Sequence, residues 1–273
     1  MFSSINKPLI MGILNMTPDS FSDGGRFTDV NTAIRRVETM LSEGADIIDI
    51  GGESTRPGSD PVTANEQIER VVPVIDAIRQ QLKEDIIISI DTTSGKVAEA
   101  ALNAGANLIN DVSAGLNDAL ILPLAAQRQV PIILMHSQGA PKTMQDNPYY
   151  ENVVSDIIAM LNDRIEAALS AGVRKENIII DPGIGFGKRK QDNLDLMAHL
   201  DQLVALGYPV LLGASRKRFM GTILAVTEPS ELVTATAVTT ALGIMAGVQL
   251  FRVHDVKENR QAADVAWAIM QRR

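Results

Sequence analysis

Eight short apolar runs, spaced at nearly regular intervals, constrain the fold of this chain more than any other feature of its sequence. They are rich in Ile, Val and Leu and alternate little with polar residues, which is typical of parallel strands covered on both faces. The runs occupy residues 9–14, 46–51, 86–91, 107–112, 130–136, 177–183, 209–214 and 249–255. Their starts recur about every 34 residues, close to the roughly 31 residues per unit of an eightfold barrel of about 250 residues. The sequence therefore predicts eight strands, each followed by a segment long enough for a helix.

The segments between the runs have helical spacing of apolar residues, which places one apolar stripe against the strands. Thr63 and Glu66 have the spacing of a capping box at the start of the second helix. Pro73 lies inside the same helical pattern, so we expect either a kink there or a helix that begins later than Thr63 indicates. Glycines stand where four of the helices should end. They are Gly44, Gly105, Gly172 and Gly207.

Eight strand and helix units without a linker or low-complexity stretch favour one α/β domain over residues 1–273, a closed eight-stranded parallel β/α barrel of the TIM type. An open doubly wound sheet would need the same units in another order, and this alternative stays open. Both folds place the active site at the carboxyl ends of the strands.

Composition and charge narrow the class of ligand. The chain has 25 Lys and Arg against 33 Asp and Glu, which gives a net charge of −8, and this balance argues against nucleic acid as the main partner. It has no cysteine, which excludes disulfides, thiolate metal sites and a thiol nucleophile. Residues 1–8 lack a signal-peptide pattern, and no apolar run approaches the roughly 20 residues of a membrane helix. We therefore expect a cytoplasmic protein that acts on small molecules.

Polar or charged residues follow every apolar run, at positions that the core of a barrel cannot use. They are Asn15, Glu53, Thr55, Arg56, Asp91, Asn110, Asp111, His136, Gln138, Asp181, Ser215, Arg216, Lys217, Arg252, His254 and Asp255. Any one of them could be a cap or turn residue, but turns alone do not need so many cations beside carboxylates. Because the carboxyl ends of the strands meet at one face, these residues predict a single site there.

The cations and the carboxylates of this set indicate two ligand regions. The cationic group suits a diphosphate with a magnesium ion, because the guanidinium fork matches phosphate oxygens. It consists of Arg56, Lys217, Arg252 and His254, supported by Asn15. The acidic group suits a ring that offers paired N–H donors, and it consists of Asp91 and Asp181 with the amide of Asn110. A buried Asp without such a donor or a nearby cation would be destabilising.

Residues 183–188 (GIGFGK) resemble a phosphate-binding loop but do not complete its pattern. Pro182 stands where the first glycine of that motif is needed, and Arg189 stands in place of its Ser or Thr. Lys188 likewise occupies the third glycine position of the dinucleotide-binding fingerprint. His199 lies within a helical pattern and is interpreted as a surface or packing residue.

Taken together, the strand-end segments resemble the dihydropteroate synthase family over essentially the whole chain. The two longest matching motifs are residues 12–25 (GILNMTPDSFSDGG) and 51–58 (GGESTRPG). The others are residues 90–92 (IDT), 110–112 (NDV), 181–188 (DPGIGFGK), 215–217 (SRK) and 252–255 (RVHD). So many motifs in this order are a specific signature.

The resemblance implies roles for individual residues. The implied catalytic residues are Asp91, Asp181, Lys217 and Arg252. The implied pterin site adds Asn110, Met135, Phe186 and Gly213 to these residues. Arg252, His254 and Asn15 would hold the diphosphate, with Asn15 as a ligand of Mg²⁺. Phe21, Thr55, Arg56 and Pro57 match loops that complete the 4-aminobenzoate site, which sulfonamides also occupy in the family.

The implied activity is the condensation of (7,8-dihydropterin-6-yl)methyl diphosphate with 4-aminobenzoate in folate biosynthesis, by a homodimer. A methyltetrahydrofolate-binding methyltransferase domain is the nearest alternative, but such a domain has no diphosphate to hold. A catalytically silent pterin-binding paralogue is a second alternative, and it would be expected to lose some of the loop motifs. The small residues between Glu231 and Gly247 would allow a helix there to pack closely against a second subunit.

Overall fold

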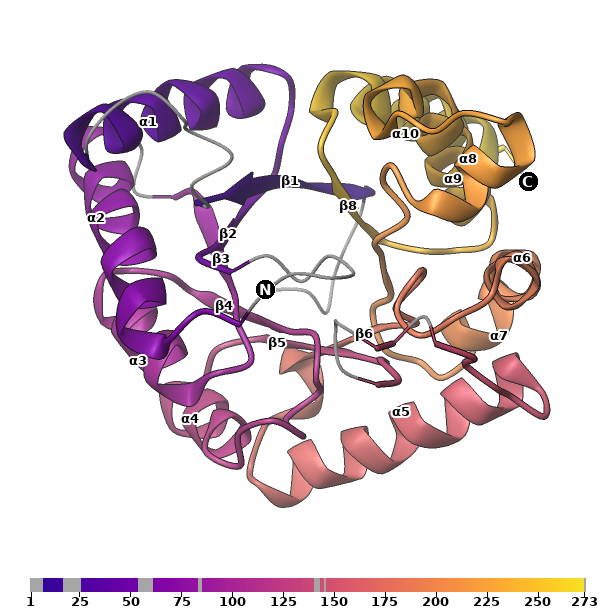
Figure 1. Ribbon diagram of the computed structural model, residues 1–273, viewed down its shortest axis with the longest axis horizontal. Helices are drawn as coiled ribbons and strands as arrows, with labels where there is room; N and C mark the ends of the chain where they lie inside the picture. Colours follow the sequence, from indigo (N-terminus) through magenta and orange to yellow (C-terminus); the bar gives the residue numbers. More distant parts are fainter. Residues whose placement is uncertain are drawn as a thin grey trace.

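The computed structural model describes residues 7–16, 26–53, 61–82, 85–139, 143–144 and 146–272, without the side chains of residues 26–29. Eight parallel strands surround the centre, and the helices lie outside them (Figure 1). The strands are β1 (Leu9–Asn15), β2 (Ile47–Gly51), β3 (Ile87–Asp91), β4 (Leu108–Asp111), β5 (Ile132–Met135), β6 (Ile178–Asp181), β7 (Leu211–Leu212) and β8 (Leu250–Val253). All eight predicted strands are confirmed, and each begins within two residues of its predicted start.

The strands form one sheet in the order β6-β5-β4-β3-β2-β1-β8-β7. A parallel bridge between Ile180 and Val210 joins the two ends of this order, with the Ile180 amide donating to the Pro209 carbonyl at 2.9 Å. The sheet therefore closes into a barrel, and the open doubly wound alternative is wrong.

The helices α1 to α5 follow the first five strands in turn, and the remaining helices complete the outer layer (Figure 1). They are α1 (Arg26–Ser42), α2 (Ala64–Gln81), α3 (Gly95–Asn103), α4 (Ile121–Arg128), α5 (Val153–Ser170), α6 (Lys190–Ala198), α7 (Leu200–Val204), α8 (Arg218–Leu224), α9 (Val233–Met245) and α10 (Val256–Met270). Two short 3-10 helices, η2 (Lys175–Asn177) and η3 (Pro229–Glu231), precede β6 and α9. In the described part of the chain, no helix combines the length and apolar character that a membrane span requires.

The helix boundaries follow the predicted signals with two exceptions. Thr63 caps α2 by accepting from the Glu66 amide at 3.3 Å, but the Glu66 carboxylate binds Arg70, so the capping box is only half formed. Because α2 begins at Ala64 and runs through Pro73, the later start is wrong, and a kink at Pro73 stays a prediction. The four predicted stop glycines all have positive φ, between 76° and 113°. His199 is exposed and separates α6 from α7.

Two apolar layers hold the barrel together. The larger layer lies between the strands and the helices, as expected for strands that are apolar on both faces. The smaller layer fills one end of the barrel interior and comprises Met11, Ile47, Leu108, Ile133, Ile179, Leu211 and Leu250. Because side chains alternate along a strand, residues two positions further on face the same interior. At that level the interior becomes polar, and the site described next begins there.

Candidate functional site

Arg252 on β8 links two strands of the barrel through a pair of carboxylates. Its Nε donates to Asp49 Oδ2 on β2, and its Nη2 donates to Asp91 Oδ2 on β3, both at 2.6 Å. Asn110 on β4 donates from Nδ2 to the same Asp49 oxygen at 3.2 Å. Short charge-assisted bonds of this kind fix the planar guanidinium in direction as well as position. A polar network thus extends across β8, β2, β3 and β4 directly above the apolar layer.

Burial strongly perturbs the groups in this network. Burial raises the pKa of Asp91 to about 7, against the opposing effect of Arg252 and with a further contribution from the Asp49 charge. For Arg252, burial lowers the pKa, but the Asp49 and Asp91 carboxylates outweigh it and the net shift is upward. Within the described residues, Asp49 Oδ1 and Asp91 Oδ1 are buried acceptors without a hydrogen-bond partner. Buried acceptors of this kind are suited to a ligand that donates N–H groups.

Asp181, at the end of β6, provides a third buried carboxylate, in addition to Asp49 and Asp91. Its Oδ1 accepts from the Gly183 amide at 2.6 Å. Burial raises the pKa of Asp181 to about 6, although that hydrogen bond and the charges of Lys217, Lys188 and Arg252 act in the opposite direction. Gly213, after β7, leaves space beside this carboxylate, since a Cβ there would lie 3.6 Å from Asp181 Oδ2.

An aromatic ring and a cation lie together over the loop that follows β6. Lys217 Nζ is 4.0 Å from the centroid of the half-buried Phe186 ring, within the range of a cation–π interaction. Gly185 admits the lysine stem, because a Cβ at that position would approach Lys217 Cδ to 3.0 Å. Met135, at the end of β5, is buried and pairs in register with Asp181. An apolar wall and a cation therefore flank the acidic group.

Lys188 holds this loop from inside the protein. Its buried ammonium group donates to the carbonyls of Gly183 at 2.8 Å and Phe186 at 3.0 Å, and it lies 2.9 Å from His136 Nδ1. Burial lowers the pKa of Lys188 to about 7, and burial together with the Lys188 charge lowers the pKa of His136 to about 3. Burial and the neighbouring Lys188 thus both disfavour a charged imidazole at His136. The partial resemblance of residues 183–188 to a phosphate loop reflects this internal support.

The loop after β8 presents His254 beside Ser215. Ser215 Oγ lies 3.0 Å from His254 Nδ1 and accepts from the His254 amide at 3.2 Å. Arg216 has a left-handed φ of 57°, and its guanidinium binds the Asp255 carboxylate through two nitrogens. This ion pair fixes the two loops that carry Lys217 and His254.

Asn15 is the last residue of β1. In the strand register it pairs with Gly51 on β2, and Gly51 pairs with Asp91 on β3. A Cβ on Gly51 would lie 3.7 Å from Asn15 Oδ1 and 3.6 Å from Asp91 Oδ2, so the glycine leaves the two oxygens facing a common space. Among the described residues, no group of three or more His, Cys, Asp or Glu side chains could hold a metal ion by itself. This oxygen set still fits Mg²⁺, which commonly takes only one or two protein ligands and completes its shell with water and substrate phosphate.

Some of the predicted site residues meet at the carboxyl end of the barrel, and others have structural roles outside that site. Asp91, Asn110, Asp181, Arg252, Met135 and Gly213 meet at the carboxyl end of the barrel, with Phe186, Lys217, His254 and Asn15 on the loops or strand ends around it. The other polar strand-end residues include structural ones: Asp111 caps the turn at Ser113 and Gly115, and Glu53 binds the Val62 amide. Phe21, Thr55, Arg56 and Pro57 lie outside the described residues.

Sequence reasoning missed Asp49, which is fully buried in the middle of the second apolar run. A signal was present, because a carboxylate inside a strand covered on both faces requires a partner. The role of Lys188 was missed as well, since the glycines around it directed attention to phosphate loops.

Comparisons with known proteins identify the family to which the chain belongs. The family model described as pterin binding enzyme matches residues 11–254. The chain is 49% identical to the dihydropteroate synthase of Clostridium beijerinckii, over 99% of this chain and 97% of that protein. It is also similar to the crystal structure of the Clostridium difficile dihydropteroate synthase in the presence of pteroic acid, with a TM-score of 0.92, 44% identity and coverage of 98% and 99% of the two chains. The structure of the Xanthomonas albilineans dihydropteroate synthase with 4-aminobenzoic acid is also similar. Its TM-score is 0.90 and its identity 43%, over 97% of this chain and 94% of that chain.

Proposed function

Because the chain belongs to the pterin-binding enzyme family and has the activity of its dihydropteroate synthases, we propose which of its residues carry that reaction. The reaction joins (7,8-dihydropterin-6-yl)methyl diphosphate to 4-aminobenzoate and releases 7,8-dihydropteroate and diphosphate. The methyltransferase domain and the silent paralogue considered above are set aside, because the relatives named by the comparisons are synthases.

The pterin ring binds at the buried polar level of the barrel, where Asp181 and Asn110 meet its N–H groups. The observation that carries this assignment is Asp91 Oδ1, a buried acceptor without a partner in the described part of the chain. A donor from the ring satisfies it, which removes the free-energy penalty of an unpaired buried acceptor. Phe186 and Met135 cover the ring, and Lys217 adds a donor at its edge.

The diphosphate binds on the side of the site where His254, Lys217 and Arg252 lie. Among the described residues, Nη1 of Arg252 makes no hydrogen bond, so this nitrogen is available to a phosphate oxygen while Nε and Nη2 stay with the carboxylates. Asn15 Oδ1 would hold a magnesium ion, which supplies positive charge to stabilise the leaving diphosphate.

The chemistry requires no protein nucleophile. The bond from the methylene carbon to the diphosphate oxygen breaks, and its electron pair leaves with the diphosphate. Positive charge then develops on the methylene and the ring, where the Asp91 and Asp181 carboxylates stabilise it. The amine nitrogen of 4-aminobenzoate forms the new bond to that carbon and loses one proton. Phe21, Thr55, Arg56 and Pro57 complete the benzoate site in this proposal.

Asp181→Asn tests the assignment. An amide in place of the carboxylate turns one acceptor into a donor that faces ring N–H groups, so pterin binding should weaken by at least about 2 kcal/mol and turnover should nearly cease. Diphosphate release measures the turnover, titration with 6-hydroxymethylpterin measures the binding, and circular dichroism checks the fold. A folded variant with the pterin affinity of the wild type would refute the role of Asp181.

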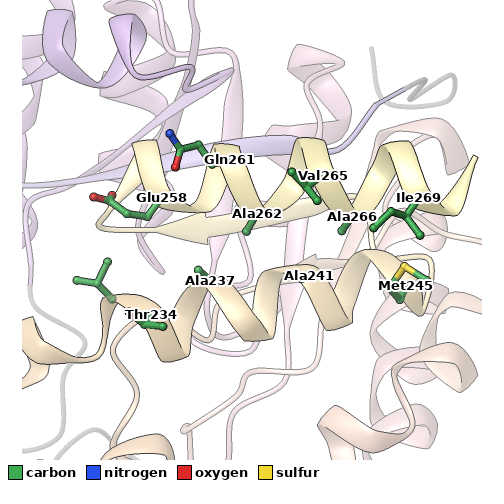
Figure 2. Close-up of a pocket in the computed structure, with 11 residues that line it drawn as sticks. Thr234, Ala237, Ala241, Met245, Glu258, Gln261, Ala262, Val265, Ala266 and Ile269 are labelled. Carbon is green, nitrogen blue, oxygen red and sulfur yellow. The ribbon is translucent and has the colours of Figure 1, made fainter.

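The quaternary state and location form the last part of the proposal. A groove of about 590 Å³ runs between α9 and α10, and Figure 2 shows Ala237, Ala241, Val265 and Ile269 along it, with Glu258 and Gln261 at one end. Large apolar side chains on these helices are exposed, which is typical of a protein interface. They are Val238, Leu242, Val265 and Ile269. We infer a homodimer through this face, in a cytoplasmic enzyme of folate biosynthesis.

A further inference from the structure

We propose that Asp49 is a positioning residue of the reaction, which orients Arg252 and the Asn110 amide relative to one another from beneath the ligand. The inference rests on the pterin and diphosphate roles proposed above for Asn110 and Arg252. It concerns a residue that itself lies below the site, within β2.

A carboxylate at the position of Asp49 is not expected to stabilise the folded barrel. Its side chain is fully buried, and residues of the apolar layer, such as Ile47 on the same strand, lie directly below it. A buried ion pair seldom stabilises a fold more than apolar residues of similar volume would. In addition, Asp49 Oδ1 is without a hydrogen-bond partner among the described residues, which is itself unfavourable. The stability of the barrel therefore does not account for this carboxylate.

The contacts of Asp49 Oδ2 do account for it. This one oxygen accepts from Arg252 Nε at 2.6 Å and from Asn110 Nδ2 at 3.2 Å. With Asp91 holding Nη2, the guanidinium is fixed at two points, and the direction of its remaining nitrogen is set before a ligand arrives. Preorganised donors of this kind need no rearrangement during the reaction.

Asp49 also determines which of two orientations the side-chain amide of Asn110 adopts. An amide can present either its oxygen or its nitrogen to a ligand, and its hydrogen-bond partners decide which. Asp49 Oδ2 accepts from Asn110 Nδ2, so it holds the Asn110 nitrogen and leaves the Asn110 oxygen as an acceptor for a ring N–H group. Asp49 thus determines which hydrogen-bonding pattern the site recognises.

Asp49→Asn tests this inference, because it retains shape and volume while it removes the charge and the strict acceptor character. We expect the KM for the pterin diphosphate to rise about tenfold, the change expected when a recognition hydrogen bond is lost. The KM for 4-aminobenzoate, measured at saturating pterin diphosphate, should stay unchanged. A purely structural role would instead lower kcat with the folded fraction and leave both KM values as they are. Asp49→Ser, which leaves room for a water molecule, serves as the second variant if the first fails to fold.

Ser89→Ala is the matched control. Ser89 is the partner of Asp49 in the strand register and is fully buried in the same layer, but its side chain makes no hydrogen bond to Arg252 or Asn110 in the structure. Its kinetic constants should equal those of the wild type. In an Asn110→Ala background, Asp49→Asn should raise the pterin KM by less than it does in the wild type, since the part of its effect that acts through Asn110 is already lost and only the part through Arg252 remains.

Three results separate this inference from the proposed function. Unchanged pterin KM in folded Asp49→Asn and Asp49→Ser, or effects that are fully additive with both Asn110→Ala and Arg252→Ala, would overturn the positioning role of Asp49. A pterin KM equal to that of the wild type in both Asn110→Ala and Arg252→Ala would instead overturn the proposed roles of those two residues, and this inference with them. The expected result is a raised pterin KM in Asp49→Asn, Asp49→Ser, Asn110→Ala and Arg252→Ala and an unchanged pterin KM in Ser89→Ala.

Discussion

The pKa values of Asp91 and Asp181 are raised by the surroundings of these two carboxylates. Asp91 and Asp181 occupy interior positions of the barrel that are buried, and burial disfavours the charged form of a carboxylate. Neighbouring cations oppose that effect without cancelling it, so both carboxylates titrate near neutrality in the unliganded protein. Functional sites commonly place titratable groups in this range.

Pterin affinity should therefore depend on pH. Asp181 has a pKa raised to about 6 by burial, so below pH 6 it becomes protonated and loses an acceptor that the ring needs. We expect the affinity for 6-hydroxymethylpterin to be constant well above pH 7 and to fall as the pH decreases, by up to about tenfold per unit below pH 6 for this group. Isothermal titration between pH 5 and 8 measures the effect. The Asp91→Asn background removes the second titration at about 7, and a constant affinity over this range in both proteins would contradict the expectation.

At the scale of elements, the segment between β6 and α6 depends on glycine for two different reasons. Gly183, Gly185 and Gly187 all have positive φ, a region that other residues occupy with strain. Gly183 also lies against the neighbouring strand end, since a Cβ there would approach the His136 carbonyl oxygen to 1.9 Å. The loop that carries Phe186 therefore has little freedom to move away from β5.

Gly183→Ala should destabilise the protein by more than backbone strain alone. Gly207→Ala is the matched control, because Gly207 also has a positive φ, of 76°, but no atom lies within 4 Å of a Cβ there. We expect the control to lose about 1 kcal/mol and Gly183→Ala to lose at least about 2 kcal/mol more, on the scale of steric overpacking. Urea unfolding of the two variants compares them directly. Equal losses would show that the His136 carbonyl can shift without penalty.

These elements also show what sequence could and could not predict. The eight strands followed from runs of Ile, Val and Leu, and the helix ends followed from glycines such as Gly105 and Gly172, because both signals are local. The polar strand ends were predicted as a group, since topology alone brings them to one face. The bonds of Asp49 to Arg252 and Asn110 could not be predicted, because they join residues 203 and 61 positions apart, and the period of a strand does not specify such pairs.

The molecule as a whole separates its surfaces by function. The polar end of the barrel carries the candidate site, whereas α9 and α10, with the exposed Val265 and Ile269 on α10 (Figure 2), belong to the outer layer of helices. α9 and α10 follow β7 and β8 in the chain, so the proposed dimer face and the Arg252 end of the site belong to adjacent units of the barrel.

Val265→Glu should dissociate the proposed dimer, because it places a charge among the exposed apolar residues of α10. Light scattering after size-exclusion chromatography should then give the mass of one chain. Leu120→Glu is the control, since Leu120 is equally exposed, at 68% against 62% for Val265, but lies next to α4 on another part of the protein. A monomeric wild type, or a dimer that survives Val265→Glu, would contradict the proposed face.

The closure of the barrel at β6 and β7 has a consequence for how binding and folding depend on each other. Between these two strands the described residues form one isolated bridge, and β7 itself is two residues long. Asp181 ends one side of this junction, and Lys217 follows the other, so a pterin bound by both, as proposed above, would span it as a non-covalent cross-link. The substrate would then complete the circumference of its own binding site. A ligand that binds only the closed junction favours closure by mass action, so ligand binding should stabilise this part of the barrel against local opening.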